Sequence, residues 1–350
     1  MKAFQLVGGS LDVHNATQLA DVAQPEPGPG QVLVRVGGAG ACHSDISLLE
    51  FSSAAPREIP MTLGHENAGW IEAFGPGTIP TPGLEVGAPV AVYGAWGCGQ
   101  CVNCRKGMEN YCLHISASGP GLSVDGGMAH YLLVPAARYL VPLGDMKPVE
   151  AAPLTDAGLT PYHAIKASLP LMVPGSYVVI IGAGGLGHLA VQFVKALSPA
   201  KVICVDQRES ALKIVADLGA DHTVVSGPNA AAEIRGIMGG RGAEVVLDIC
   251  GYDDTLALAS AVAAPLGRLT IVGVGGGTLP VNFFAFPYEC SVQSTYWGSV
   301  TELSELLELA RSGGFRVHAS TYALENAGDV YAKMVDGTLQ GRAVIVPNER

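Results

Sequence analysis

The sequence predicts an α/β fold in which a doubly wound parallel sheet is joined to a second, largely β and irregular domain. Two observations support this prediction. From Ser176 to Gly273, short apolar runs alternate with helical patterns, as in a parallel sheet that is buried on both faces. Before about Asp156, short strands and frequent Gly and Pro replace long helical patterns, which favours a largely antiparallel domain.

Composition narrows the class of protein. With 350 residues, 49% of them hydrophobic and 15% charged, the chain can fill two cores and is not expected to be disordered. The net charge of −11 argues against binding to nucleic acid or to an anionic membrane surface. No secretory signal pattern and no membrane-length apolar run is evident, so we expect a cytoplasmic protein whose cysteines stay reduced.

The elements follow in chain order. One strand of the irregular domain is expected at 31–36. The strands of the parallel sheet are expected at 177–181, 201–206, 222–225, 244–248 and 268–273. Helical patterns follow the first two of these strands, as far as Leu197 and Leu218. Nearer the C-terminus we expect a helix at 301–311 and a strand at 343–346, in a segment that folds back onto the first domain.

A glycine-rich motif lies where the first strand of the parallel sheet meets its helix. The G-x-G-x-x-G pattern is matched by Gly182-Ala183-Gly184-Gly185-Leu186-Gly187. Such glycines let a pyrophosphate approach the backbone at the positive end of the helix. Asp206, which ends the next strand, can bind ribose hydroxyls and would repel a 2′-phosphate. The motif therefore predicts NAD binding; the alternative is a glycine-rich turn with a purely structural role.

Four closely spaced cysteines form the most specific motif of the chain. They are Cys98, Cys101, Cys104 and Cys112. Four thiolates at these spacings can surround one Zn²⁺ tetrahedrally and leave no open position, which predicts a structural zinc lobe at about 96–113. Disulfides are disfavoured by the reducing compartment, and the spacing matches iron–sulfur motifs poorly.

Cys42 and His65 are candidates for a second metal site with an open position. Both lie in glycine-flanked, polar settings that differ from core strands. Each also has another interpretation, as a buried thiol or as a core histidine. The residues alone leave both interpretations open.

Together these motifs resemble those of zinc-dependent medium-chain alcohol dehydrogenases, in particular the bacterial secondary-alcohol dehydrogenase and arylacetaldehyde reductase branch. The resemblance covers essentially the whole sequence. It is carried by the C-H-S-D turn at Cys42, the G-H-E-x-x-G motif at His65, the cysteine lobe, segment 153–162, the glycine motif and segment 341–347. It implies a GroES-like catalytic domain at 1–155, an NAD-binding Rossmann domain at 156–290, and a segment at 291–350 that completes the catalytic domain.

The resemblance also implies a ligand set and a cofactor site. Cys42, His65 and Asp156 would hold a catalytic zinc, with Glu66 behind the metal or acting as a transient ligand. Many relatives have cysteine in place of Asp156, and the harder carboxylate would change metal affinity and Lewis acidity. Besides the glycine motif and Asp206, the residues implied in cofactor binding are His43, Thr160 and Arg342.

The implied reaction is hydride transfer between NAD(H) and a secondary or aryl alcohol and its ketone or aldehyde, in an enzyme with two zinc ions per chain. Ser44 would accept the hydroxyl proton. Many relatives continue this relay with a histidine where this chain has Ser47, so we expect the relay to end at water or another group. The residues implied in the substrate pocket are Ser47, Arg57, Tyr296 and Trp297.

Two alternatives stay open at this stage. One is a quinone or enone reductase of the same fold that uses NAD(P)H and lacks catalytic zinc, and the other is a non-catalytic nucleotide-binding protein. The joint presence of Cys42, His65 and Asp156 argues against the first, and Ser44 beside them argues against the second. The expected partners are a small-molecule substrate and further copies of the chain, in a homodimer or homotetramer.

Overall fold

The structure is a computed structural model that describes residues 1–51, 58–114, 119–339 and 341–349. The chain forms two compact units. The first unit comprises Met1–Leu159, Trp297–Arg311 and Val317–Arg350, and the second comprises Thr160–Tyr296 and Ser312–Arg316. None of the helices in the described residues combines the length and the apolar character needed to cross a membrane.

The second unit is built on a six-stranded sheet with the order β11-β10-β9-β12-β13-β14. All its neighbouring strands are parallel. The strands are β9 (Tyr177–Ile181), β10 (Lys201–Asp206), β11 (His222–Val225), β12 (Ala243–Asp248), β13 (Ala263–Ile271) and β14 (Ser291–Ser294). The central strands consist almost wholly of buried Val, Ile and Leu because helices cover the sheet. This strand order is that of a doubly wound dinucleotide-binding sheet, so the predicted fold class is confirmed.

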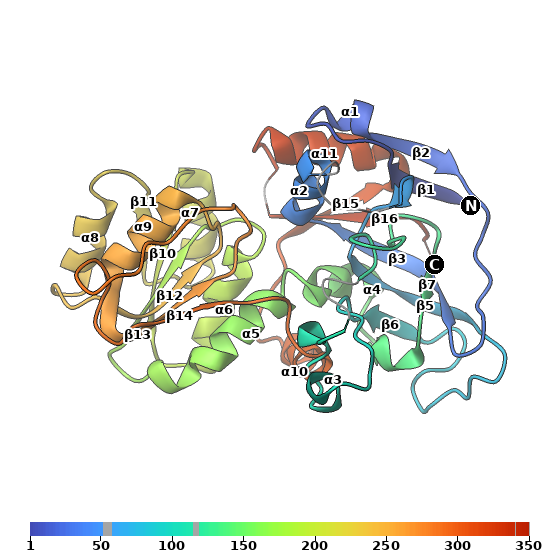
Figure 1. Ribbon diagram of the computed structural model, residues 1–350, viewed down its shortest axis with the longest axis horizontal. Coiled ribbons are helices and arrows are strands. Elements are labelled where there is room, and N and C mark those ends of the chain that lie inside the picture. Colours follow the sequence, from blue (N-terminus) through green and yellow to red (C-terminus); the bar gives the residue numbers. More distant parts are fainter. Residues whose placement is uncertain (52–57, 115–118, 340, 350) are drawn as a thin grey trace. The chain divides into compact units, whose positions relative to one another are not determined.

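Helices connect the strands of this sheet, as Figure 1 shows in green, yellow and orange. They are α6 (Gly187–Leu197), α7 (Glu209–Asp217), α8 (Ala230–Ile237) and α9 (Asp253–Val262), while α5 (Leu159–Ser168) and the 3-10 turn η4 (Leu169–Leu171) precede β9. Helix α6 begins at the last glycine of the glycine-rich motif. The motif therefore forms the turn between β9 and α6, as the dinucleotide-binding prediction requires.

The first unit contains two sheets with mostly antiparallel pairing. One has the order β2-β1-β4, and the other has the order β15-β16-β3-β5-β6-β8, with β7 paired to β3. The strands are β1 (Lys2–Leu6), β2 (Thr17–Asp21), β3 (Val32–Ala41), β4 (Met61–Thr62), β5 (Glu66–Phe74), β6 (Pro89–Val92), β7 (Tyr131–Val134), β8 (Leu140–Pro142), β15 (Ala319–Ala323) and β16 (Arg342–Val346). The red strand β16 lies beside the blue strand β3 in Figure 1, so the last strand completes a sheet begun near the N-terminus.

Short helices complete this unit. They are α1 (Val13–Ala16), α2 (His43–Phe51), α3 (Val102–Arg105), α4 (Pro148–Ala151), α10 (Val300–Arg311) and α11 (Ala327–Val335), with 3-10 turns η1 (Glu109–Tyr111), η2 (Ala137–Tyr139), η3 (Ala152–Thr155) and η5 (Leu324–Asn326). Most of them are one or two turns long, in keeping with the irregular domain that the sequence predicts.

The unit boundaries differ from those expected. Residues 156–159 belong to the first unit, and 291–296 belong to the second. Strand β14, Ser291–Ser294, pairs with β13 and continues the parallel ladder. Its sequence, Ser-Val-Gln-Ser, gives no apolar run because an edge strand is only partly covered, which is why the pattern did not reveal it.

Candidate active site

Four potential metal ligands gather in the first unit. They are Cys42, His65, Glu66 and Asp156, and one ligand atom from each lies within 4.8 Å of the others. Cys42 directly follows β3, while His65 directly precedes β5. Because β3 and β5 pair antiparallel, the end of one strand lies beside the beginning of the other. Asp156 follows η3 and joins them from a distant part of the sequence.

The separations between these atoms fit a tetrahedral metal. The Oδ2 atom of Asp156 lies 3.9 Å from Cys42 Sγ and 3.3 Å from His65 Nε2. At usual zinc bond lengths, neighbouring ligand atoms around a tetrahedral Zn²⁺ are roughly 3.4 to 3.8 Å apart. Thiolate, imidazole and carboxylate are also the donor types that zinc takes in proteins. The residues present therefore fit a zinc ion.

The electrostatics of His65 point to the same conclusion. Its side chain is 1% exposed, and its Nδ1 lies 2.9 Å from Asp45 Oδ1. Burial lowers the pKa of His65, but the Asp45 charge and hydrogen bonds to Asp156 and Asp45 outweigh it and raise the pKa well above its usual value. The carboxylates around His65 thus favour a positive charge at this imidazole. A cation at Nε2 would supply that charge.

Asp45 is a functional residue to which the sequence analysis assigned no role. Its buried carboxylate accepts a hydrogen bond from the backbone N–H of Cys42 at 3.1 Å and lies against His65 Nδ1. An Nδ1–H donated to a carboxylate leaves Nε2 as the metal-binding atom. The available signal was the fourth position of the C-H-S-D turn, where an acid follows the candidate ligand Cys42 by three residues.

Glu66 forms a buried ion pair with Arg342. The Nη2 atom of Arg342 donates to both carboxylate oxygens of Glu66. The Arg342 side chain is 4% exposed and that of Glu66 is 0% exposed. Burial raises the pKa of Glu66 to about 7 against the opposing effect of Arg342. Gly40, opposite Glu66 in the ladder, leaves the room, because a Cβ there would lie 1.9 Å from Oε2. Arg342 thus pairs with a member of the ligand cluster, and its expected role at the pyrophosphate stays a prediction.

The other predicted residues of this unit have distinct surroundings. Ser44, in the first turn of α2, is half-buried with its Oγ 3.7 Å from Cys42 Sγ. The Ser47 hydroxyl donates to the backbone oxygen of His43, whose side chain is exposed. Arg57 lies outside the described residues.

Trp297, expected in the substrate pocket, packs directly against the proposed ligand His65. Its ring is buried and meets His65 edge-on, with the ring centroids 6.0 Å apart, and its Nε1–H donates to the Thr155 carbonyl at 3.1 Å. The Trp297 ring therefore restrains His65 by packing, in addition to the hydrogen bond to Asp45. Tyr296, its neighbour in sequence, belongs to the second unit and is half-buried.

In the second unit, the glycine-rich motif and Asp206 lie together. Asp206 Oδ2 accepts a hydrogen bond from the Ala183 N–H at 2.7 Å, which ties the end of β10 to the motif. Gly187 is required sterically, since a Cβ there would lie 1.9 Å from the Gly182 oxygen. Near Gly184, by contrast, the space is open enough for a ligand to reach the backbone. Thr160 is buried on α5 of the same unit.

The four cysteines of the lobe also come together in the first unit. Their Sγ atoms are 3.4 Å apart for Cys101 and Cys104, 3.8 Å for Cys98 and Cys104, and 4.0 Å for Cys101 and Cys112. These separations again match a tetrahedral zinc site. The Tyr139 hydroxyl anchors the entry to the lobe by donating to the Gly97 oxygen at 2.5 Å.

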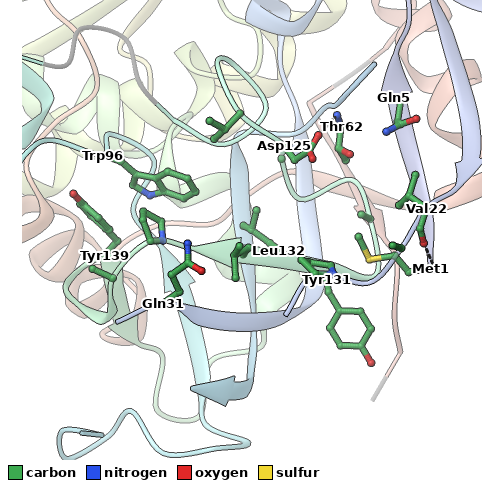
Figure 2. A pocket seen from close by; sticks show the side chains of 18 of the residues that line it. Met1, Gln5, Val22, Gln31, Thr62, Trp96, Asp125, Tyr131, Leu132 and Tyr139 are labelled. Carbon is green, nitrogen blue, oxygen red and sulfur yellow. Dashed lines mark hydrogen bonds between the residues drawn. The ribbon is translucent and has the colours of Figure 1, made fainter. Parts of the chain in front are cut away.

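A cavity of about 680 Å³ in the same unit has a different lining. Figure 2 shows Trp96 and Tyr139 on one side of it and Asp125 and Thr62 on another. Asp125 already accepts the Thr62 N–H at 2.7 Å. The cavity contains none of the predicted catalytic or cofactor-binding residues, so it does not contribute to the site described above.

Comparison with known proteins agrees with this geometry. Residues 28–145 match the family model of the alcohol dehydrogenase GroES-like domain, and residues 185–312 match that of the zinc-binding dehydrogenases. The chain is 35% identical to an NAD-dependent alcohol dehydrogenase of Sulfurisphaera tokodaii, over 99% of this chain and 100% of that protein.

Two solved structures are similar over nearly the whole chain. The alcohol dehydrogenase of Aeropyrum pernix has a TM-score of 0.90 and 36% identity, over 99% of this chain and 100% of that one. The acetophenone reductase of Geotrichum candidum, solved in complex with NAD, has a TM-score of 0.85 and 30% identity, over 99% of this chain and 96% of that one. The chain therefore belongs to the family of zinc-dependent medium-chain alcohol dehydrogenases and is an oxidoreductase of that family.

Proposed function

We propose that this enzyme transfers a hydride between NAD(H) and a secondary or aryl alcohol and its ketone or aldehyde, with one catalytic and one structural zinc per chain. The observation that carries the proposal is the close grouping of Cys42, His65 and Asp156. Three such ligands leave one tetrahedral position for substrate, whereas the four-cysteine group leaves none.

Zinc bound at this group would supply Lewis acidity, which lowers the pKa of an alcohol hydroxyl and polarises a carbonyl in the reverse direction. The chain's own residues organise that chemistry. Asp45 orients His65, and Arg342 balances the charge of Glu66. The half-buried Ser44 hydroxyl, beside Cys42, can accept the substrate proton and release it toward solvent. Ser47, whose hydroxyl bonds to the α2 backbone, takes no part in this transfer.

The cofactor is NAD rather than NADP in this proposal. The Asp206 carboxylate at the end of β10 would accept hydrogen bonds from the ribose hydroxyls and repel a 2′-phosphate. The open backbone near Gly184, at the start of α6, suits a pyrophosphate. The NAD-dependent relative from Sulfurisphaera tokodaii supports the same choice.

The preferred substrate is apolar and bulky. The buried Trp297 ring lies against His65, so part of the surface near the ligands is aromatic. Similarity to an acetophenone reductase supports an aryl ketone or its alcohol.

We also propose that the chain forms a homo-oligomer through the edge of the parallel sheet. Strand β14 ends that sheet, and within the described residues no further strand pairs with it. Nearby, an aromatic patch formed by Phe283, Phe284 and Tyr288 is strongly exposed, with Phe284 at 92%. An open strand edge beside exposed aromatic rings favours burial against a second copy.

The zinc content and the ketone reductase activity test the main proposal together. We expect two zinc ions per wild-type chain and oxidation of NADH with acetophenone, which chelation abolishes. Replacing Asp156 by Ala should leave one zinc and lower kcat/KM by more than about 100-fold. This loss is larger than the one usually caused by removing a residue that only supports the metal ligands.

The variant Asp221→Ala is the matched control, because Asp221 pairs with Lys195 in the second unit and lies in neither cysteine group nor ligand cluster. It should keep both zinc ions and full activity. A wild-type chain that holds a single zinc and reduces enones but no ketones would contradict the proposal and support a reductase without catalytic metal.

A further inference from the structure

The Asp45 carboxylate links two of the proposed zinc ligands. It is fully buried in the first turn of α2. Its Oδ1 lies 2.9 Å from His65 Nδ1, and its Oδ2 accepts the backbone N–H of Cys42 at 3.1 Å. One carboxylate thus fixes the imidazole of one ligand and the backbone of another.

Tyr331 holds this carboxylate from the C-terminal part of the chain. It lies on α11, is fully buried, and donates its hydroxyl to Asp45 Oδ2 at 2.6 Å across 286 positions of sequence. Its ring stacks on Phe4 with the centroids 5.9 Å apart and the planes at 11°. The Sδ atom of Met128 lies 3.2 Å from the hydroxyl. The stacking on Phe4 restrains the ring, and with it the position of the hydroxyl beside Asp45.

The hydroxyl matters because the Asp45 carboxylate has no contact with solvent. A buried carboxylate needs hydrogen-bond donors on its oxygens, and bonds to a charged acceptor are among the strongest in proteins. Without the Tyr331 hydroxyl, Oδ2 would keep the Cys42 N–H but lose its hydroxyl donor, so the Asp45 carboxylate would be held by fewer hydrogen bonds. Burial and the Asp45 charge raise the pKa of Tyr331 well above its usual value, so the phenol stays a donor.

We propose that Tyr331 is a positioning residue of the catalytic zinc site and acts through Asp45 on His65 and Cys42. The inference rests on the proposed zinc site at Cys42, His65 and Asp156. The competing interpretation is that Tyr331 only fills the interior between α11 and β1.

Substitution by phenylalanine separates these interpretations, because Tyr331→Phe keeps the stacked ring and removes only the hydroxyl. We expect zinc at the catalytic site to bind about 10-fold more weakly in chelator competition, within the range found for residues that orient metal ligands. The zinc at the four cysteines should be held as in wild type. After Co²⁺ substitution of the catalytic site, the visible absorption bands should shift, since ligand orientation changes.

Thr17→Val is the matched control. Thr17 is also buried in the first unit, and its hydroxyl donates to the Val13 oxygen at 2.7 Å without contact with Asp45. Both variants should lose a few degrees of Tm, roughly 2–4 °C. If Tyr331→Phe retains catalytic zinc as tightly as Thr17→Val and leaves the Co²⁺ spectrum unchanged, Tyr331 serves packing alone and the proposal is wrong.

A double-mutant cycle tests the route through Asp45. In an Asp45→Asn background, Tyr331→Phe should change zinc affinity far less than it does in wild type, because the shared intermediary is already altered. Equal effects in both backgrounds would overturn the route. A wild-type chain that takes up no zinc at Cys42, His65 and Asp156 would refute the proposed function as well, whereas normal wild-type binding with an unaffected Tyr331→Phe variant would refute this inference alone.

Discussion

At the scale of single residues, three aspartates have different tasks because different groups surround them. Asp156 is half-buried with its oxygen near a thiol and an imidazole, which is the setting of a proposed metal ligand. Asp45 is fully buried, and its carboxylate accepts hydrogen bonds from the Cys42 N–H and the Tyr331 hydroxyl, so it orients its neighbours. Asp206 ends a strand beside the glycine motif, where a ribose would lie. Residue type alone does not distinguish these tasks, whereas the burial of each carboxylate and the hydrogen bonds that it accepts do.

The first prediction concerns Asp206. Replacing it by Ala removes the charge that would repel a 2′-phosphate, and Arg208, two residues later, could then pair with that phosphate. We expect the ratio of kcat/KM for NADPH to that for NADH to rise by at least about 10-fold, which corresponds to about 1.4 kcal/mol. Steady-state kinetics with both cofactors measure this ratio.

Asp217→Ala is the control for this change, because Asp217 is exposed on α7 of the same unit. It removes the same charge without altering the end of β10. If Asp206→Ala and Asp217→Ala shift the cofactor ratio equally, the effect is one of overall charge and the assignment of Asp206 fails.

The candidate ligands could be identified from the sequence more readily than the residues that hold them in place. Cys42, His65 and Asp156 stand in motifs, and the structure brings them together. The partner of Asp45 could not be found in this way, since Tyr331 lies 286 positions away in a helix with no motif. Only the tertiary fold brings such residues into contact, and a hydrophobic pattern shows a buried tyrosine as core.

At the scale of elements, the turn between β9 and α6 must keep the helix close to the sheet. Gly187 begins α6, and its missing side chain allows the backbone to pass the Gly182 oxygen. This close approach restricts the geometry of the turn, which would also direct the N-terminus of α6 toward a cofactor phosphate in the proposed site. A methyl group at this position would push the helix away from that geometry.

From this follows a second prediction, for Gly187→Ala. The new Cβ would lie 1.9 Å from a backbone oxygen, so the turn must move. We expect the dissociation constant for NADH to rise by at least about 10-fold, as measured by NADH fluorescence. Gly236→Ala is the control, because Gly236 lies within α8 and a Cβ there meets no atom within 4 Å. That variant should bind NADH normally and gain about 0.5–1 kcal/mol of stability; weakened binding in both would contradict the steric argument.

The third prediction concerns the cysteine lobe, whose short helix α3 and turn η1 cannot form a core of their own. Replacing Cys112 by Ser should remove the structural zinc and lower Tm by about 10 °C or more, because metal binding supplies folding free energy for such a lobe. Metal analysis and calorimetry measure both effects. The control Cys290→Ser removes a thiol outside both ligand groups and should change neither. A Cys112→Ser chain with two zinc ions and an unchanged Tm would exclude the structural role.

Elements were predicted well where one physical signal dominates. The central strands β9, β10 and β12 are continuous apolar runs, and the structure has them within one residue of the predicted bounds. The strand expected at 31–36 extends to Ala41, because its glycine-rich end has no side-chain pattern but still pairs with β5 and β16. Backbone pairing without a side-chain pattern is invisible to periodicity.

At the scale of the whole molecule, the sequence predicted the fold class because the strand–helix alternation specifies a doubly wound sheet. It did not predict that Ser312–Arg316 belongs to the second unit, between two segments of the first. The chain crosses between units at points with no distinctive composition. Contacts made after folding, rather than local sequence, decide those boundaries.

The fourth prediction concerns assembly. Replacing Phe284 by Asp places a charge in the exposed aromatic patch beside the sheet edge, and a charge buried in an interface without a partner is costly. We expect the oligomer to dissociate at concentrations where wild type stays associated, as measured by analytical ultracentrifugation. Ile79→Asp is the control, since Ile79 is 84% exposed in the other unit. If both variants sediment like wild type, the patch is not the interface.

The position of β16 in its sheet has a consequence for how the protein is made. This strand, Arg342–Val346, lies between β15 and β3, and Arg342 carries the charge that balances Glu66. A ribosome adds roughly 5–20 residues per second. During synthesis the second unit can therefore form while the first still lacks β16, and the Glu66 carboxylate then lacks the balancing charge of Arg342. The proposed metal ligands, made earlier, reach their final environment only after β16 has left the ribosome.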